Sequence, residues 1–442
     1  MLATKQPIRV GVACLVRKTF DWQAAWAIFT EIQRDLGTIA QVQWQIIQEP
    51  IIEVEDARRA GKLLAQADLD GLVIISGTFH LGHLALELAR AAVCPVLLWG
   101  LPELPYDGGK IRLNSVCGVN LNASNLYKGG VRTYHVNLGR AIDEAWLDAL
   151  RVNRALAEAR LAIAGAHAHG FFNLGYDQLN TWRQLGVLAD HYELSEIFDQ
   201  PVTDEDVARQ KGKLVQAFKT SDVSPGQLDK TALLAAKLET FMETRGITAL
   251  ALRCWPEFAR DFWIAPCAAM SLLQSQGRII ACEGDVEGAL SMLAQRALGA
   301  VTPFLADLSQ VDLSEDFALL WHCGVAPCNL WDGVSVCSLD SYFADGKGVT
   351  ADFVLKSGAI SLLRLDSVGQ EIRLFLQVAQ AVPMSKDLKG TYAKVKFPQG
   401  VRQVLDTVTA NGIAHHISVA YGDFSAPLAL LAKIKGWRVV KC

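Results

Sequence analysis

Four side chains that can bind a metal ion each lie at the edge of an apolar, β-like run in the second half of the sequence. Glu283 follows RIIAC, Asp307 ends VTPFLAD, His322 lies near the end of FALLWHC, and His416 is the second residue of HHISVAYGD. A buried charge is costly unless it is paired or bound to a metal, so one shared divalent ion would explain all four positions. Mixed carboxylate and imidazole ligands suit Mn²⁺, Fe²⁺, Co²⁺ or Zn²⁺.

Each position also has a purely structural explanation. Glu283 begins the acidic stretch EGDVE, which opens a helix, and carboxylates at a helix N-terminus are favoured by the helix dipole. Asp307 can cap a loop, and His322 can be a core histidine with a satisfied hydrogen bond. We assign Asp285 and Glu287 to the structural role, as carboxylates of the first helical turn. Only the positions of these side chains in space distinguish the two explanations.

The first third of the chain alternates apolar strands with helices. The strands are expected in IRVGVACLV, QVQWQIIQEPII, GLVIISG and VCPVLLWG, and the helices between them in WQAAWAIFTEIQRDLG, EDARRAGKLLAQAD and HLALELARAA. Uninterrupted apolar strands separated by helices are typical of a parallel sheet covered on both faces. Residues 106–130 are rich in glycine and asparagine, and we expect them to form a loop.

A second α/β unit starts near residue 159 and includes the strands ITALALRCW and RIIACEG. After residue 303 short β-like runs with turn signals predominate, as in an antiparallel sheet or small barrel. The predicted fold class is therefore α/β, with two doubly wound, Rossmann-like parallel-sheet domains (1–158 and 159–303) followed by a β-rich, barrel-like C-terminal domain (304–442).

Composition narrows the classes of partner. The 442 residues carry a formal net charge of −4, which gives no basic field for nucleic acid. The sequence lacks a secretory signal and a run long enough to span a bilayer, so we expect a cytoplasmic protein that does not enter a membrane. The ten cysteines lie mostly in apolar runs, which is typical of reduced, buried thiols. Neither G-x-G-x-x-G nor G-x-x-x-x-G-K-[ST] occurs, so a nucleotide cofactor is not expected.

Four motifs in order carry a family resemblance: ACEGDVEGAL, FLADL, WHCGVAP and AHHISVAYGD. With this order and spacing, residues from about 160 to 442 resemble the L-fucose isomerase / L-arabinose isomerase superfamily, and most of all its shorter "fucose isomerase-like" members. The resemblance implies an aldose–ketose isomerase, an intramolecular oxidoreductase of carbohydrate metabolism that uses Mn²⁺ or a similar divalent ion and a cis-enediol intermediate. The chain is shorter than true fucose isomerases, so the loops that determine the sugar can differ.

The resemblance also implies roles for individual residues. Glu283 and Asp307 match metal-binding carboxylates that also relay protons, so we expect them to be catalytic. His416 matches the ligand histidine, with His415 as the less favoured substitute. His322 matches a ligand position of the arabinose branch, whereas the fucose branch uses two carboxylates and one histidine.

The substrate of such an enzyme is a monosaccharide. Arg253, Trp255 and Glu257 end the strand next to that of Glu283 and are candidates for the sugar pocket, and Trp99, at the end of an N-terminal strand, is a candidate for contact with the sugar ring. The resemblance further implies a homo-oligomer, a trimer or hexamer. The alternative function is a sugar-binding or regulatory protein that keeps the scaffold without catalysis.

Overall fold

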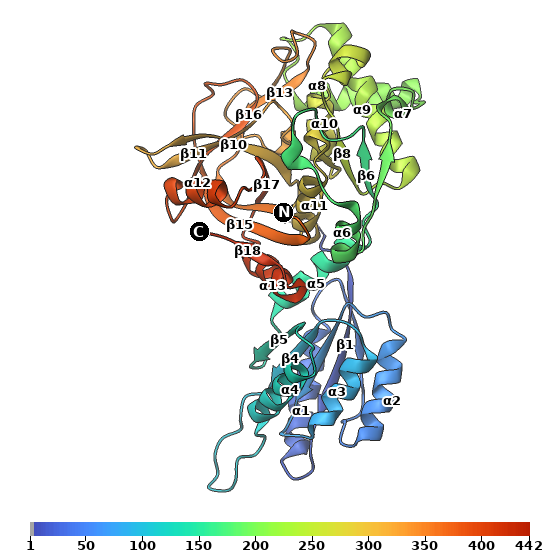
Figure 1. Ribbon diagram of the computed structural model, residues 1–442, viewed down its shortest axis with the longest axis vertical. Helices are drawn as coiled ribbons and strands as arrows, with labels where there is room; N and C mark the ends of the chain where they lie inside the picture. The colour runs from blue at the N-terminus through green and yellow to red at the C-terminus, as the bar shows by residue number, and fades with distance from the viewer. Residues whose placement is uncertain (1–3) are drawn as a thin grey trace. The chain divides into compact units, whose positions relative to one another are not determined.

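The computed structural model describes residues 4–442 and divides them into two compact units (Figure 1). The N-terminal unit comprises residues 5–154 and 429–436. The C-terminal unit comprises residues 155–428 and 437–442, together with Thr4. The predicted fold class is confirmed, because two parallel α/β sheets precede a β-rich C-terminal part. The domain boundaries at 158 and 303 stay predictions; the division into units falls after residue 154, and residues on both sides of 303 share one unit.

The N-terminal unit contains a five-stranded parallel sheet in the order β2-β1-β3-β4-β5. Its strands are β1 (Ile8–Leu15), β2 (Val42–Ile46), β3 (Gly71–Ser76), β4 (Val96–Gly100) and β5 (Tyr134–Leu138). The connecting helices are α1 (Trp22–Leu36), α2 (Val54–Ala65), α3 (Gly82–Ala91), α4 (Ser115–Lys128) and α5 (Glu144–Ala157). Strand β3 is buried along its whole length, as expected of a central strand with helices on both faces.

The expectation of a loop over residues 106–130 is wrong for its second half, which forms helix α4. Its composition is poor for a helix, but its small and polar residues fit the contact with the sheet. A side chain at Gly118 would come within 3.1 Å of Ser76 and of the Thr78 carbonyl oxygen, so glycine allows the close approach. Asn122 is buried and donates a hydrogen bond to the Ser76 hydroxyl at 3.3 Å. Tertiary contacts therefore outweigh the local preference.

The C-terminal unit begins with a four-stranded parallel sheet in the order β7-β6-β8-β9. Its strands are β6 (Leu161–Ala164), β7 (Ala189–Tyr192), β8 (Ala249–Leu252) and β9 (Ile279–Ala281). The helices of this segment are α6 (Gln178–Leu185), α7 (Leu194–Phe198), α8 (Asp204–Ala217), α9 (Pro225–Arg245), α10 (Cys267–Ser275) and α11 (Val286–Ala297).

Six strands of the following nine-stranded sheet close into an antiparallel barrel. In ring order they are β16 (Thr391–Lys396), β11 (Phe317–His322), β10 (Phe304–Asp312), β17 (His416–Tyr421), β14 (Gly358–Val368) and β15 (Glu371–Val382), and β15 pairs back to β16. Closure removes unpaired strand edges. The other strands of this sheet are β12 (Ser338–Asp340), β13 (Thr350–Val354) and β18 (Arg438–Val440), and helix α12 (Val401–Ala410) follows β16 in the chain. Helix α13 (Ser425–Lys435) continues beyond residue 428 into the N-terminal unit.

Helix α11 joins the parallel sheet to the barrel. It contacts β8 and β9 of the parallel sheet and β14 and β17 of the barrel, and nearly all of its residues are buried. Figure 1 shows α11 between β8 and β17. One continuous hydrophobic core includes Leu250 of β8, Phe304 of β10 and Phe375 of β15. The start of α11 is therefore held rigidly beside one end of the barrel.

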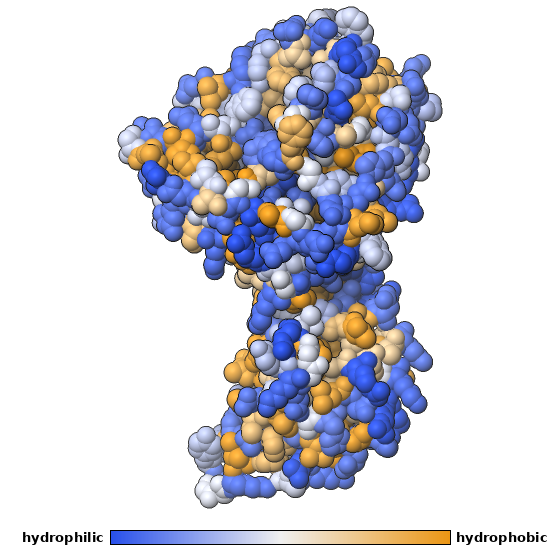
Figure 2. Space-filling view, in the orientation of Figure 1, coloured by the Kyte–Doolittle hydropathy of each residue, from blue (hydrophilic) through white to orange (hydrophobic). Residues whose placement is uncertain are grey.

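None of the helices formed by residues 4–442 combines the length and apolar character needed to cross a membrane. On the face drawn in Figure 2, hydrophobic residues are interspersed among hydrophilic ones.

Candidate active site

The end of the barrel and the start of α11 bring the predicted metal-binding residues together. Asp307 on β10 lies directly opposite His416, the first residue of β17, in the antiparallel register. His322 is the last residue of β11, which also pairs with β10. Glu283 lies in the 3-10 turn Cys282–Gly284 that connects β9 to α11. Four segments that are distant in the sequence thus meet at one place.

His416 is the centre of this cluster. Its Nε2 lies 3.4 Å from Oε2 of Glu283 and 3.8 Å from Oδ1 of Asp307. Ligand atoms of Glu283, His415 and His416 all lie within 4.8 Å of one another, and so do those of Asp307, His322 and His416. The four predicted residues and His415 therefore form two adjoining groups, which share His416.

The turn that carries Glu283 has an unusual backbone. Glu283 has φ 61°, in the left-handed region that residues other than glycine rarely adopt. Its carbonyl oxygen accepts a hydrogen bond from the backbone N–H of Ala168 at 2.9 Å. Gly284 has φ 73°, and a Cβ there would lie 2.2 Å from the Ala166 carbonyl oxygen. Strained backbone held by its surroundings is frequent at functional sites, and here it aims the Glu283 side chain at His416.

The proton on the His416 ring is fixed by Asp285. Nδ1 of His416 lies 3.0 Å from Oδ2 of Asp285, and both side chains are fully buried. A carboxylate accepts hydrogen bonds, so when the ring is neutral its proton lies on Nδ1 and the lone pair on Nε2. Asp285 also caps α11 by accepting from the backbone N–H of Gly288 at 2.8 Å, and it forms an ion pair with the buried Arg364. Asp285 was predicted to be a structural carboxylate of the first helical turn; it lies one position earlier, as the N-cap of α11, and its contact with His416 was not predicted.

The other two histidines carry their protons on the opposite nitrogen. Nδ1 of His322 accepts the backbone N–H of Cys323 at 2.8 Å, and Nδ1 of His415 accepts from Nδ2 of Asn173 at 3.0 Å. When neutral, both rings therefore carry the proton on Nε2. Nε2 of His415 lies 3.4 Å from Oε2 of Glu283. Of the three rings, that of His416 presents a lone pair on Nε2 to the cluster.

Charges within the cluster displace several pKa values. Burial opposes ionisation of Glu283, but the hydrogen bond from His415 and the charges of the three histidines outweigh it and lower its pKa. Burial also opposes protonation of His416, and there the hydrogen bond and charge of Asp285, with the charges of Asp307 and Glu283, raise the pKa. Burial lowers the pKa of His322.

Two polar atoms at the cluster are buried without a hydrogen-bond partner among residues 4–442: Oδ1 of Asp307 and Nε2 of His322. Buried polar atoms in native proteins are nearly always satisfied, so an acceptor and a donor left open at one place indicate a site for something bound. Two carboxylates and one imidazole lone pair are a suitable donor set for a divalent cation such as Mn²⁺. The residues present therefore fit the ion that the resemblance implies.

Of the candidates for the sugar pocket, Trp255 is connected to this cluster through Phe171. The ring of Trp255 packs edge-on against Phe171 at 5.8 Å, and Phe171 packs edge-on against His415 at 5.2 Å. Arg253 forms an ion pair with Glu257 at 2.7 Å, and Nε of Arg253 and Oε2 of Glu257 have no partner among residues 4–442. Sequence reasoning missed Phe171, because its contact with His415 depends on how the loop after β6 folds back.

Trp99 belongs to the N-terminal unit. Its side chain is buried in β4, and its Nε1 donates a hydrogen bond to the Gly139 carbonyl oxygen at 2.8 Å. It has a core role in that unit, and its contact with a sugar stays a prediction.

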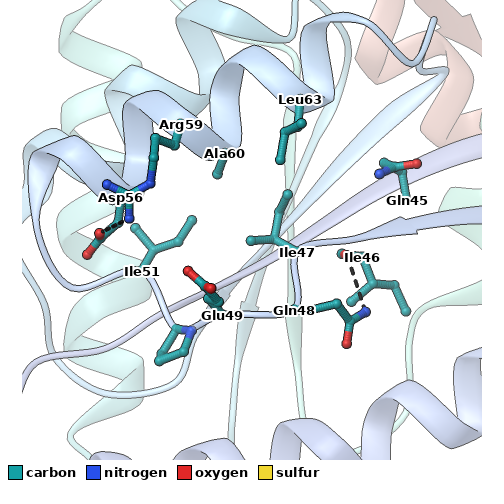
Figure 3. A pocket seen from close by; sticks show the side chains of 11 residues that line it. Gln45, Ile46, Ile47, Gln48, Glu49, Ile51, Asp56, Arg59, Ala60 and Leu63 are labelled. Atoms are coloured by element: carbon teal, nitrogen blue, oxygen red, sulfur yellow. Dashed lines mark hydrogen bonds and ion pairs between the residues drawn. The ribbon is translucent and has the colours of Figure 1, made fainter.

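A separate pocket of about 320 Å³ lies in the N-terminal unit (Figure 3). Figure 3 shows Ala60 and Leu63 on α2 facing Ile47, with the Asp56–Arg59 ion pair at one side. None of the predicted site residues lines it, and its centre is apolar.

Similarity to curated proteins agrees with the class that this site defines. The chain is homologous along nearly its whole length to sugar isomerases, which confirms the enzyme class predicted from the sequence. The relatives are named sulfoquinovose isomerase. The protein from Priestia aryabhattai is 27% identical over 440 residues, which cover 95% of each chain. The protein from Alkalicoccus urumqiensis is 25% identical over 386 residues, which cover 84% of this chain and 86% of the relative. The protein from Clostridium sp. strain MSTE9 is 28% identical over 378 residues, which cover 82% of this chain and 83% of the relative.

No family model matches the chain, so membership of the fucose/arabinose isomerase superfamily stays a prediction. Among solved structures, the substrate-binding protein of a sugar ABC transport system from Bordetella parapertussis aligns with a TM-score of 0.16 and 12% identity over 64% of this chain and 77% of that one.

Proposed function

We propose that the protein is a divalent-metal-dependent isomerase that interconverts an aldose and its ketose through a cis-enediol. The observation that carries the proposal is the approach of two carboxylates from separate segments to Nε2 of His416, with Glu283 at 3.4 Å and Asp307 at 3.8 Å. Homology to sugar isomerases over almost the whole chain supports the reaction class.

Glu283, Asp307 and His416 are the proposed metal ligands, with Mn²⁺ as the expected ion. His322 and His415 are better suited to donating a proton from Nε2, because Nδ1 of each ring accepts a hydrogen bond. His322 was also a predicted ligand; we propose instead that its Nε2–H donates to a sugar oxygen. When bound, a divalent cation supplies Lewis-acid polarisation of the sugar oxygens.

The chain's own groups can move the required protons. Isomerisation removes the proton from C2 of the open-chain aldose, returns a proton to C1, and transfers a hydroxyl proton between O1 and O2. Oδ1 of Asp307 has no hydrogen-bond partner among residues 4–442 and is thus free to accept a proton. Burial opposes ionisation of Glu283, but the hydrogen bond from His415 and the charges of the histidines lower its pKa, so Glu283 is ionised at neutral pH. We assign general acid–base roles to these two carboxylates.

Sulfoquinovose is the first substrate to test, because the curated relatives carry its name. Trp255 and Phe171 form an apolar wall beside His415, and the Arg253–Glu257 pair, from the same segment as Trp255, has polar atoms without a partner among residues 4–442. A sugar presents both apolar C–H faces and hydroxyl groups, and this wall and this pair match the two kinds of surface.

The test is exchange of the C2 proton in deuterated water, followed by NMR with Mn²⁺-loaded protein, sulfoquinovose and a panel of unsubstituted aldoses. We expect deuterium incorporation and ketose formation with at least one sugar, and loss of both after chelation or in His416→Gln. Glu371→Gln, an exposed change on β15, serves as the control and should retain activity.

The proposed isomerase activity is contradicted if metal-loaded protein exchanges no sugar proton. Protein with confirmed bound Mn²⁺ that exchanges no sugar proton is not an isomerase of these sugars. If the same protein binds a sugar without exchange, the alternative of a sugar-binding or regulatory protein is supported.

A further inference from the structure

Asp285 makes more contacts than a helix cap needs. Its side chain is fully buried. Oδ1 accepts the Gly288 backbone N–H at 2.8 Å, which is the capping bond. Oδ2 is used separately, for Nδ1 of His416 at 3.0 Å and for the ion pair with Arg364. Serine, threonine or asparagine cap a helix as well as aspartate does, so capping does not account for the second oxygen.

Arg364 holds Asp285 in this orientation. Arg364 is fully buried on β14 and lies 3.6 Å from Glu287 and 3.8 Å from Asp366 in addition to its contact with Asp285. Asp366 accepts a hydrogen bond from Arg373 at 2.7 Å. Rotation of Asp285 away from Arg364 would leave a buried guanidinium without its closest counter-ion, which is strongly unfavourable.

The same ionic network returns to the segment that carries His416. Nη2 of Arg373 donates to the carbonyl oxygen of Gly412 at 3.2 Å, four residues before His416 in the chain. Two parts of the site therefore contact the same buried charged residues of the β14–β15 hairpin. Asp285, which bonds to the His416 ring, pairs with Arg364, and the backbone before His416 bonds to Arg373.

A neutral imidazole can bind a metal through only one of its nitrogens, and the hydrogen bond of the other nitrogen decides which. Metal-binding histidines commonly donate their remaining N–H to a carboxylate, which orients the ring and raises its basicity. His415 and His322 lack such a carboxylate acceptor at Nδ1, which instead accepts a hydrogen bond in both.

We propose that Asp285 is a positioning residue that fixes the proton of His416 on Nδ1 and so keeps Nε2 as a metal-binding atom, with Arg364 as its buried anchor. This inference rests on the proposed function for the metal itself. The position of the proton, however, is a property of the metal-free protein and is measured independently.

The experiment compares three variants with the wild type. Asp285→Ser combined with Arg364→Met retains a helix cap and removes the acceptor for His416 together with the arginine that pairs with it. Asp366 keeps its ion pair with Arg373, and Glu287, whose pKa burial already raises to about 7, can remain protonated. Asp285→Asn is the conservative variant, because its amide oxygen can still accept from Nδ1. Glu287→Gln is the matched control: it alters another carboxylate beside Arg364 that does not contact His416.

Two measurements are made on each folded protein. Long-range ¹H–¹⁵N NMR on the metal-free, histidine-labelled protein identifies which nitrogen of His416 carries the proton, with His416→Gln for assignment. Calorimetric titration with MnCl₂ gives the metal affinity. We expect Nδ1 to be protonated in the wild type, Asp285→Asn and Glu287→Gln, and a mixture in the double variant. The double variant should lose about 10- to 100-fold in Mn²⁺ affinity, Asp285→Asn less, and Glu287→Gln none.

The results separate the two proposals. Two results overturn the role of Asp285. One is a neutral His416 ring with its proton on Nε2 in the wild type, and the other is a folded double variant whose proton position and Mn²⁺ affinity are unchanged. A wild type that binds no Mn²⁺ overturns the proposed function and the metal-binding part of this inference, while the NMR measurement still decides whether Asp285 sets the proton position.

Discussion

Replacing Glu287 with glutamine should stabilise the protein at neutral and alkaline pH. Glu287 on α11 is 3% exposed, and burial raises its pKa from 4.5 to about 7, against the favourable charge of Arg364 and the hydrogen bond from the Ser367 backbone N–H. Asp366 and Asp285, which also lie near it, raise the pKa further. In the folded protein the carboxyl group therefore holds its proton to higher pH than in the unfolded chain.

The sign follows from proton linkage. Between about pH 4.5 and about pH 7 the folded state binds more protons at Glu287, so the free energy of unfolding decreases as pH rises through this window. A tenfold change in an ionisation constant corresponds to ~1.4 kcal/mol, so ionisation of Glu287 removes about 3 kcal/mol above pH 7. Glutamine keeps the size and the acceptor for Ser367 but does not ionise, and its variant should be the more stable protein by up to this amount.

Urea unfolding followed by circular dichroism, at a series of pH values across the window, measures the difference between the variant and the wild type. The difference should grow with pH and level off above the pKa. Glu371→Gln, which removes an exposed carboxylate on β15, controls for the change in net charge and should show no such growth. If Glu287→Gln is less stable than the wild type at alkaline pH, the attraction of Arg364 outweighs burial and the reasoning is refuted.

Three further changes test other parts of the fold. Gly284→Ala places a methyl group 2.2 Å from the Ala166 carbonyl oxygen at positive φ, so it should lower the melting temperature and the Mn²⁺ affinity. Gly212→Ala, inside α8 with open space around it, is the control and should stabilise the protein by about 0.5–1 kcal/mol. Calorimetry that finds equal stability for the two variants contradicts the packing argument. Glu103→Ala removes an acceptor for three backbone N–H groups in the loop before α4 and should speed proteolytic cleavage there, as mass spectrometry of the fragments will show. Among the cysteines of residues 4–442, Cys117 is the exposed one, so Cys117→Ser should abolish the fast phase of the reaction with Ellman's reagent; a persisting fast phase means that another thiol is open.

Part of the candidate site could be predicted from the sequence for a physical reason. Glu283, Asp307, His322 and His416 each stand at the edge of an apolar run, where a polar residue is unexpected, and the structure brings them together. Asp285 looked like an ordinary first-turn carboxylate, because its contact with His416 arises only when β17 closes the barrel over α11. The class of fold was predictable because strands buried on both faces are continuously apolar.

Other features depend on packing between distant segments. Helix α4 was missed because Gly118 and Asn122 disfavour an isolated helix, yet they suit contact with the end of β3. The oligomeric state stays a prediction from the resemblance.

Closure of the barrel by β17 has a consequence for the order of events during synthesis and folding. His416 pairs with Asp307 on β10 and bonds to Asp285, 131 residues earlier in the chain, and such distant contacts form late. A nascent chain that has not yet released residues 413–442 lacks both the last strand of the ring and the histidine at the centre of the cluster. Binding of the proposed metal ion would therefore require completed folding. An ion that binds only the folded state stabilises that state by mass action. Metal supply would thus affect the lifetime of the folded protein rather than its early folding intermediates.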